Sequence, residues 1–236
     1  MMNQYVVLDI ETTGTHPLRS DIIEIGAVYV DNNEVKKTFN ELICPNDEIT
    51  SYITSITGIT NEMVKDKRKI EEVLPEFIEF CQEVPLVGHN IILFDYPMLK
   101  AKAEKLKMTF EREVLDTLVI SRKMLEALPS RRLGDLCLYY NISLEHAHRA
   151  YDDAFATYNL YEKLKNDFYH IDAGLFKPRA VKYELPKITP LTTKQKNYVL
   201  KLCKWHNLGE IEGLDELTKS EASRLIDKII SQYGRM

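Results

Sequence analysis

The hydrophobic pattern at the start of the chain predicts strands. Residues 4–10 (QYVVLDI) form an almost continuous apolar run, as in a strand that is buried on both faces. A second strand is predicted at 22–29, and after the turn sequence Asp31-Asn32-Asn33 residues 34–43 return as a third strand, so the pair predicts a hairpin. We therefore expect three antiparallel strands at the beginning of the fold.

After residue 60 the hydrophobic period becomes helical. Apolar residues recur every three or four positions between 70 and 83, which predicts an amphipathic helix. Short apolar runs at 85–88 and 114–116 predict two further strands. Additional helices are predicted at 96–106, 117–128, 131–140 and 150–168. Strands that alternate with helices after an antiparallel start predict an α/β fold, in which helices flank a mixed sheet.

The pattern is interrupted from residue 173 onward, where one glycine and three prolines occur with little periodicity before residue 191. Such a segment is typical of a linker. Two amphipathic helices are predicted after it, at 192–206 and 218–233. We therefore divide the chain into a first domain at 1–172, a linker at 173–190 and a small helical module at 191–236.

The charge balance differs between these parts. The whole chain has 31 basic and 36 acidic residues and a net charge of −5, but residues 187–236 carry nine basic residues against six acidic ones. An acidic first domain argues against a protein that simply coats DNA. It is compatible with an enzyme that gathers carboxylates around metal ions, because the cations offset the negative charge locally.

Cysteine usage and the absence of targeting segments predict a cytoplasmic protein with no membrane contact. The four cysteines are far apart and form no C-x-x-C pair, so neither a zinc site nor a disulfide framework is expected. The first residues lack the basic and apolar regions of a signal peptide. No run approaches the roughly eighteen apolar residues that a membrane-spanning helix needs.

Two acids at the end of the first predicted strand are the first candidates for chemistry. Asp9 and Glu11 are two positions apart, so their side chains point to the same face of the strand. Neighbouring carboxylates repel each other unless a cation lies between them, and Mg²⁺ or Mn²⁺ suits such oxygen ligands. Because a pair of acids also occurs at solvated strand ends by chance, this motif alone does not identify a metal site.

The second candidate segment, 89–95 (HNIILFD), follows a predicted strand and ends in Asp95. Asp95 directly precedes the predicted helix 96–106, so it could cap that helix as well as join a metal site. His89 and Asn90 could likewise close a turn. From the residues alone both readings stay open.

The third candidate segment leads into the long predicted helix. Asp153 lies in its first turn, where the helix dipole favours a carboxylate. His148 precedes the helix and titrates near neutral pH, which suits proton transfer. His146 and Asp152 are the competing candidates in the same segment. Only one of the two aspartates should enter a site, because neighbouring helical positions face different directions.

Together the three motifs resemble the DEDDh branch of the DnaQ-like 3′→5′ exonuclease family, which includes proofreading exonuclease subunits and ribonuclease T. The motifs D-I-E-T-T-G at 9–14, H-N-x-x-x-F-D at 89–95 and H-x-x-x-x-D at 148–153 occur in the family's order. The resemblance covers about residues 3–168. It implies a ribonuclease H-like fold, with a five-stranded mixed sheet and helices on both sides. Thr57 and Ile91 depart from the family pattern, in which histidine and alanine are common there, and they bear on substrate preference.

The resemblance also implies the activity and the site. The enzyme would hydrolyse phosphodiester bonds at the 3′ ends of nucleic acids, in the first place single-stranded DNA, and would act in repair or proofreading. Two ions of Mg²⁺ or Mn²⁺ would be held by Asp9, Glu11, Asp95 and Asp153, with His148 as the general base. The residues expected near the substrate are Thr12, Thr13, Gly14, His89, Asn90 and Phe94. For Phe94, an ordinary place in the core is the alternative.

The predicted module after residue 191 resembles a small helical module of some exonuclease X-like proteins. Thr218 and Glu221 have the spacing of a capping box at the start of its last helix. Its lysines would serve to dock nucleic acid or a replication or repair protein. The alternative is a purely structural appendage with a solvated lysine face.

Other functions fit parts of the pattern. One is an exoribonuclease that trims RNA 3′ ends, because the choice between DNA and RNA depends on contacts around the 2′-OH. Others are a non-catalytic nucleic-acid-binding subunit and a structural subunit of a replication complex. The complete set of five catalytic candidates argues against a mere binder, since a cluster of acids would repel phosphates.

Overall fold

The computed structural model describes residues 2–144, 148–185, 189–209, 211 and 213–235. It consists of two compact units, Met1–Leu185 and Pro186–Met236. His146, one of the two histidines considered for proton transfer, lies outside the described residues.

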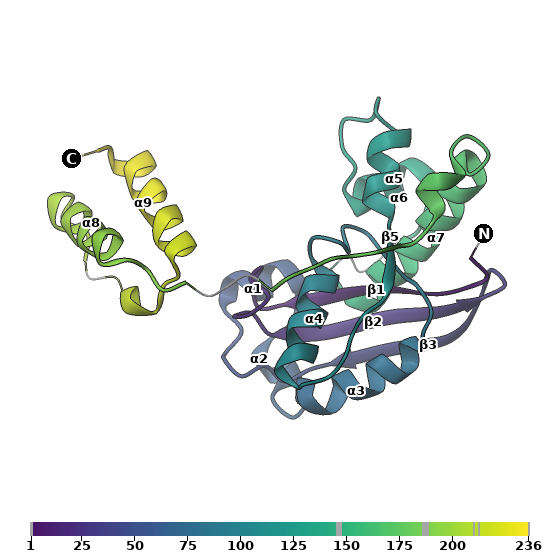
Figure 1. Ribbon diagram of the computed structural model, residues 1–236, viewed down its shortest axis with the longest axis horizontal. Coiled ribbons are helices and arrows are strands. Elements are labelled where there is room, and N and C mark those ends of the chain that lie inside the picture. Colours follow the sequence, from purple (N-terminus) through teal and green to yellow (C-terminus); the bar gives the residue numbers. More distant parts are fainter. Residues whose placement is uncertain (1, 145–147, 186–188, 210, 212, 236) are drawn as a thin grey trace. The chain divides into compact units, whose positions relative to one another are not determined.

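A mixed sheet forms the centre of the first unit (Figure 1), and six strands belong to it in the part of the chain that the structure describes. In the order β3-β2-β1-β4-β5-β6, they are β3 (Glu34–Leu42), β2 (Ile22–Asp31), β1 (Gln4–Thr12), β4 (Leu86–Gly88), β5 (Glu113–Asp116) and β6 (Arg179–Ala180). The first three strands are antiparallel, whereas β4 and β5 run parallel to β1. The predicted fold class is confirmed. The predicted count of five strands is one short, because β6 is a pair of residues that carries no sequence pattern.

Helices cover both faces of this sheet (Figure 1). One face packs against α3 (Ile70–Cys81) and α4 (Asp95–Lys105). The other face packs against α5 (Thr117–Met124), α6 (Leu133–Tyr140) and α7 (Ala150–Phe168). Two short helices, α1 (Ser51–Thr57) and α2 (Asn61–Val64), form a small separate core with Ile23 and Ile49. The sequence did not predict α1, whose threonines and isoleucines favour strands when considered locally.

Alternate residues of β1 enter two different cores. Val6, Leu8 and Ile10 pack on the α3–α4 side, whereas Tyr5 and Val7 pack on the α5–α7 side. The period of two along a strand continues the second series through positions 9 and 11. The two acids at the end of β1 therefore face the helices α5–α7.

The first unit extends beyond the predicted domain end at residue 172. A short 3₁₀ helix, η1 (Ala173–Phe176), places the buried Phe176 ring against Tyr161 and Tyr169. β6 then pairs with β5 at the edge of the sheet. These contacts attach residues 173–185, which the sequence assigned to a linker, to the first unit. Glycine and proline content predicted the loss of regular structure but not this packing.

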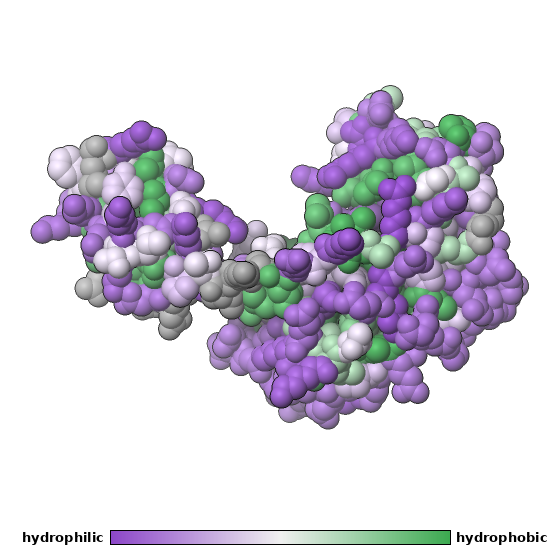
Figure 2. All heavy atoms as spheres, in the orientation of Figure 1, coloured by the Kyte–Doolittle hydropathy of each residue, from purple (hydrophilic) through white to green (hydrophobic). Residues whose placement is uncertain are grey.

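The second unit contains two helices, α8 (Thr193–Trp205) and α9 (Lys219–Tyr233), with a 3₁₀ turn η2 (Leu214–Glu216) before α9. Both helices begin with a capping box, in which Thr192 and Thr218 each accept a hydrogen bond from the backbone N–H three residues later. Val199, Leu202 and Ile229 form the centre of their shared core. In the view of Figure 2, hydrophilic residues cover most of each unit and hydrophobic ones reach the surface in small areas. No helix among the described residues has the length and apolar character needed to cross a membrane.

Candidate active site

The carboxylates of Asp9 and Glu11 lie near the carboxyl end of β1. In the register with β2, Asp9 pairs with Gly26 and Glu11 with Glu24. β1 connects to β2 on one side and lies beside the parallel β4 on the other. Ligands of α/β sheets bind outside the strand ends where the connections diverge in this way. The first two acidic candidates are thus at the edge of the sheet where a binding site is expected.

Asp95 is buried beside the end of β1. It is the first residue of α4, its exposed fraction is 2%, and its Oδ1 accepts a hydrogen bond of 3.2 Å from the backbone N–H of Ile10. The residue at the helix cap is Phe94, so the alternative role of Asp95 as the N-cap does not describe this helix. The carboxylate therefore reaches the strand segment that carries Asp9 and Glu11.

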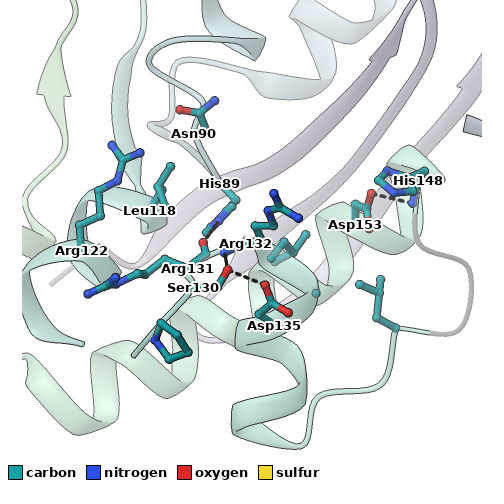
Figure 3. Close-up of a pocket in the computed structure, with 14 residues that line it drawn as sticks. His89, Asn90, Leu118, Arg122, Ser130, Arg131, Arg132, Asp135, His148 and Asp153 are labelled. Carbon is teal, nitrogen blue, oxygen red and sulfur yellow. Dashed lines mark hydrogen bonds between the residues drawn. The ribbon is translucent and has the colours of Figure 1, made fainter. Parts of the chain in front are cut away.

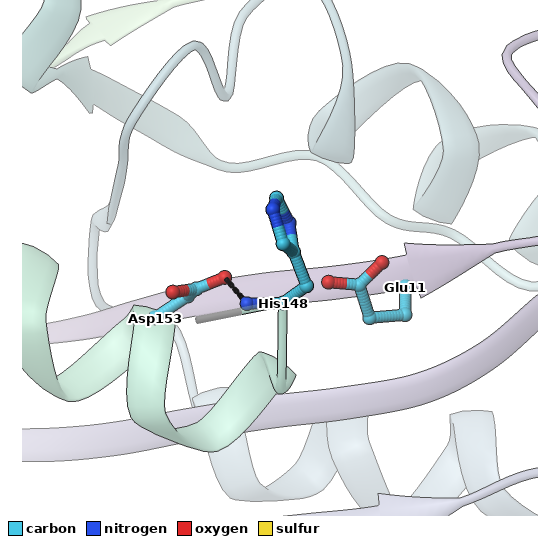
Figure 4. A group of neighbouring side chains, drawn as sticks. All are labelled: Glu11, His148 and Asp153. Carbon is cyan, nitrogen blue, oxygen red and sulfur yellow. Dashed lines mark hydrogen bonds between the residues drawn. The ribbon is translucent and has the colours of Figure 1, made fainter. Parts of the chain in front are cut away.

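Asp153 and His148 come from the start of α7. The Oδ2 atom of Asp153 accepts a hydrogen bond of 3.0 Å from the backbone N–H of His148, which has a left-handed backbone with φ of 67°. Possible ligand atoms of Glu11, His148 and Asp153 lie within 4.8 Å of one another (Figure 4). The His148 side chain is exposed and the Asp153 side chain is buried. Of the two neighbouring aspartates, Asp153 is the one in this group.

Burial raises the pKa of all four carboxyl groups. Burial, followed by the charges of the neighbouring acids, raises the pKa of Asp9 well above its ordinary value and that of Glu11 to about 8. Burial also raises the pKa of Asp95 to about 7 and that of Asp153 to about 6, although backbone N–H groups lower both in part. The raised pKa values favour the protonated form of these groups when no cation is bound.

The donor set fits hard divalent cations. Four carboxyl groups supply only oxygen ligands, which Mg²⁺ and Mn²⁺ prefer. Arg149 is the basic side chain beside Glu11, but its guanidinium binds Glu24. Cations could bind among Asp9, Glu11, Asp95 and Asp153. Their positive charge would offset the repulsion between the carboxylates, which adds to the effect of burial on the pKa values.

Comparison with known proteins agrees with this geometry. The sequence model of the RNase_T exonuclease family matches residues 6–161. The chain belongs to this exonuclease family. The assignment to DnaQ-like 3′→5′ exonucleases made from the three motifs is confirmed, and enzymes of this family depend on metal ions.

Two relatives illustrate how much of the chain is shared. The PolC-type DNA polymerase III of Caldanaerobacter subterraneus subsp. tengcongensis is 45% identical over 161 residues, which are 68% of this chain and 11% of that protein. The PolC-type DNA polymerase III of Thermotoga maritima is 41% identical over 154 residues, 65% of this chain and 11% of that protein. The exonuclease chain thus spans about a tenth of the length of these curated relatives.

Solved structures share the fold of this exonuclease. Exonuclease I of E. coli, in a zinc-bound complex with single-stranded DNA, has a TM-score of 0.66 at 20% identity, over 75% of this chain and 42% of that one. Exonuclease X in complex with 5′-overhanging duplex DNA has a TM-score of 0.55 at 23% identity, over 69% of this chain and 92% of that one. At these identities the likeness supports the ribonuclease H-like fold alone.

The start of α7 in the exonuclease is held by two residues of β2 that the motifs did not reveal. The fully buried carboxylate of Glu24 binds the Arg149 guanidinium and accepts a hydrogen bond of 3.0 Å from Ala150 N–H. A Cβ atom added to Gly26 would lie 2.1 Å from backbone atoms of Ala150 and Tyr151. The sequence IIEIGAV carried both signals, since an acid within a buried apolar run needs a partner and a glycine inside a strand marks a close approach.

The turn after β1 is internally hydrogen-bonded at the edge of the site. Thr12 Oγ1 donates to the carbonyl of Gly14 at 2.6 Å. Thr13 and Asp21 exchange two hydrogen bonds of 2.8 Å, one through the Thr13 hydroxyl and one between backbones. The expected substrate contacts of Thr12, Thr13 and Gly14 thus fall on a turn whose shape is fixed by the protein.

The loop after β4 is anchored by a buried acid that lies outside the three sequence motifs. Asp116, at the end of β5, accepts hydrogen bonds from the backbone N–H groups of Asn90 at 2.9 Å, Ile92 at 3.3 Å and Leu118 at 2.9 Å. Asn90 has a left-handed backbone with φ of 71°. One carboxylate therefore fixes the loop that leads to Asp95.

His89 uses both ring nitrogens within the protein. Its Nε2 lies 2.9 Å from the carbonyl of Arg131, which can only accept, and its Nδ1 lies 2.9 Å from the hydroxyl of Thr117. Burial lowers the pKa of His89, and the Thr117 hydroxyl also donates to the carbonyl of Gly88 at 3.2 Å. Phe94 packs against the α3–α4 core. The contacts of both residues are thus with the protein, and any contact with substrate is in addition to them.

Proposed function

We propose that this domain removes nucleoside 5′-monophosphates from the 3′ end of single-stranded DNA, with two ions of Mg²⁺ or Mn²⁺ and with His148 as the general base. The observation that supports it is the convergence of Asp9, Glu11, Asp95 and Asp153 from three distant segments. The polymerase names of the relatives and the single-stranded DNA in the exonuclease I complex support DNA as the substrate.

The four carboxylates would hold the ions, which supply stabilisation of charge on the scissile phosphate and activation of water. His148 lies on the exposed approach to α7, where its imidazole can take a proton from the attacking water. Its backbone N–H is bound to Asp153, so the base is tied to one of the proposed metal ligands. The turn 12–14 closes the site beside β1 and would meet the terminal nucleotide, with His89, Asn90 and Phe94 around it.

The PolC-type relatives support a role in proofreading or repair. The second unit would then dock nucleic acid or a replication or repair protein through its lysines. Because this chain spans only about a tenth of those relatives, association with a polymerase is part of the proposal.

The proposal is tested with 5′-labelled single strands of DNA and RNA in Mg²⁺, Mn²⁺ or EDTA. Stepwise shortening of DNA that stops in EDTA is the expected result. Faster shortening of RNA would assign the domain to exoribonucleases instead. Binding without any shortening would leave a non-catalytic nucleic-acid-binding subunit.

A further inference from the structure

A cleft of about 770 Å³ opens directly beside the candidate active site. His148 and Asp153 line it at one end, and His89 and Asn90 also contribute to its wall (Figure 3). Small-molecule sites have volumes of about 300–1,000 Å³, so the cleft is large enough for part of a single strand. Of the four carboxylates, only Asp153 lines this cleft.

Three arginines line the rest of this cleft, which we call the arginine cleft: Arg122 of α5, and Arg131 and Arg132 before α6. In Figure 3, Arg122 and Arg131 lie on the side opposite His148 and Asp153, and Arg132 lies between them. Among the described residues, no ion pair involves the side chain of Arg122 or Arg132. Asp135, the other acid in the lining, is hydrogen-bonded to Ser130 at 2.5 Å.

Arg131 is held in part by the protein itself. One of its terminal nitrogens donates to the carbonyl of Glu126 at 2.5 Å. Its Nε is buried and has no hydrogen-bond partner in the described part of the chain.

The start of α6 adds to the positive potential of the arginine cleft. Arg132, Leu133, Gly134 and Asp135 all line it, and the side chain of the N-cap residue Arg132 makes no capping hydrogen bond. Free N–H groups and the helix dipole at such an end favour an anion. The hydrogen bond from His89 to the Arg131 carbonyl fixes this segment to the end of β4 beside the catalytic acids.

We propose that the arginine cleft binds backbone phosphates of the single strand whose terminal nucleotide is hydrolysed. The inference rests on the proposed function, because the cleft opens onto the same catalytic residues. Phosphate diesters match the arginines in charge and accept hydrogen bonds from guanidinium groups. The arginines read no base, so the cleft strengthens binding of longer strands without sequence preference. A dinucleotide, which has no second phosphodiester, gains little from it.

The test uses the full chain with the double variant Arg122→Gln/Arg132→Gln. The matched control is Lys37→Gln/Lys67→Gln, which removes the same charge from exposed positions outside the cleft. Initial rates are measured in Mg²⁺ on oligothymidylates of two and twelve nucleotides, between low and moderate salt. Binding of the longer strand is measured in EDTA over the same salt range.

The expected result is a higher KM for the longer strand, on the order of tenfold, with kcat unchanged and hydrolysis of the dinucleotide unaffected. The slope of log affinity against log salt should fall by about 1.4, since each phosphate contact to a single strand contributes about 0.7. The same KM and slope as wild type, or equal changes in the lysine control, would overturn the inference. If wild type shortens neither strand, the proposed function fails, and that result is separate from any effect of the arginines.

Discussion

The guanidinium of Arg149 is bound to the carboxylate of Glu24 by three hydrogen bonds. Its Nε lies 3.1 Å from each oxygen, and a terminal nitrogen lies 2.7 Å from Oε1. Glu24 is fully buried and is the register partner of Glu11, whereas Arg149 is the N-cap residue of α7, next to His148. The pair therefore ties the start of α7, which carries Asp153, to β2, the strand that pairs with Glu11 of β1.

Replacing Glu24 by alanine should lower both stability and activity. Removal of the carboxylate leaves the buried Ala150 N–H and the partly exposed Arg149 guanidinium without their partner, which costs about 1–3 kcal/mol. Urea unfolding measures this loss, and the initial rate on single-stranded DNA measures displacement of α7. Glu24→Gln, which keeps the shape and an acceptor for Ala150 N–H, should lose less. The control is Glu48→Ala at an exposed position, and an equal effect there would contradict the positioning role.

Gly26→Ala should displace the start of α7. The added Cβ would lie 2.1 Å from the backbone of Ala150 and Tyr151, so strand or helix must move. Overpacking of this kind costs about 1–3 kcal/mol. The midpoint temperature of thermal unfolding and kcat should both fall. In Gly134→Ala the new methyl meets open space on α6, and helical alanine is favoured over glycine by about 0.4–1 kcal/mol, so that variant should be at least as stable as wild type.

The sequence predicted the positions of the four acids better than the residues that hold their segments in place. Asp9 and Glu11 could be assigned to one face because the strand period is two, and the order of the motifs predicted their convergence with Asp95 and Asp153. The partners of Glu24 and Asp116 could not be predicted, because a buried acid shows that a partner is needed but not which one. The arginine cleft was missed for the same reason: Arg122 and Arg132 come together only through the packing of α5 and α6. β6 is too short to carry any pattern.

Without divalent ions, the domain should lose stability as pH rises from about 4 to about 8. The acids have ordinary pKa values of 3.8 and 4.5, and in the folded state these are raised, for Glu11 to about 8. The folded state thus binds more protons than the unfolded state within this window, so stability decreases with increasing pH. Thermal unfolding in EDTA from about pH 5 to pH 9 measures the effect.

Mg²⁺ should reverse that decrease, and its stabilising effect should grow with pH because cations compete with protons for the carboxylates. Glu11→Gln should remove the upper part of the pH dependence in EDTA. A domain whose stability in EDTA is constant or rises across the window would show that the four carboxyl groups do not have raised pKa values as described.

Ending the chain after Leu185, where the first unit ends, should weaken binding of long strands while leaving hydrolysis of a small nucleotide ester intact. The small ester reaches the active site without needing the second unit. Binding of long oligonucleotides and ester hydrolysis are compared between the two forms. A full-length variant with Lys201→Gln/Lys204→Gln lacks the charge of two lysines of α8. It tests whether that charge contributes to the binding of long oligonucleotides. Equal affinity in all three proteins would make the second unit a structural appendage.

His148→Asn should lower kcat by about 10²–10⁴-fold, the usual contribution of a general base, with KM changed little. Asparagine tolerates the left-handed backbone at this position, so the N–H bond to Asp153 is kept and only the titratable ring is lost. His148→Ala adds backbone strain and should show the same loss of kcat together with lower stability. His170→Asn, at an exposed histidine after α7, is the control and should behave as wild type. The rates of wild type and His148→Asn are compared across pH, because asparagine cannot take a proton from water. A variant that keeps both the rate and the pH profile would remove His148 from the proton transfer and leave the base to another residue of the same loop.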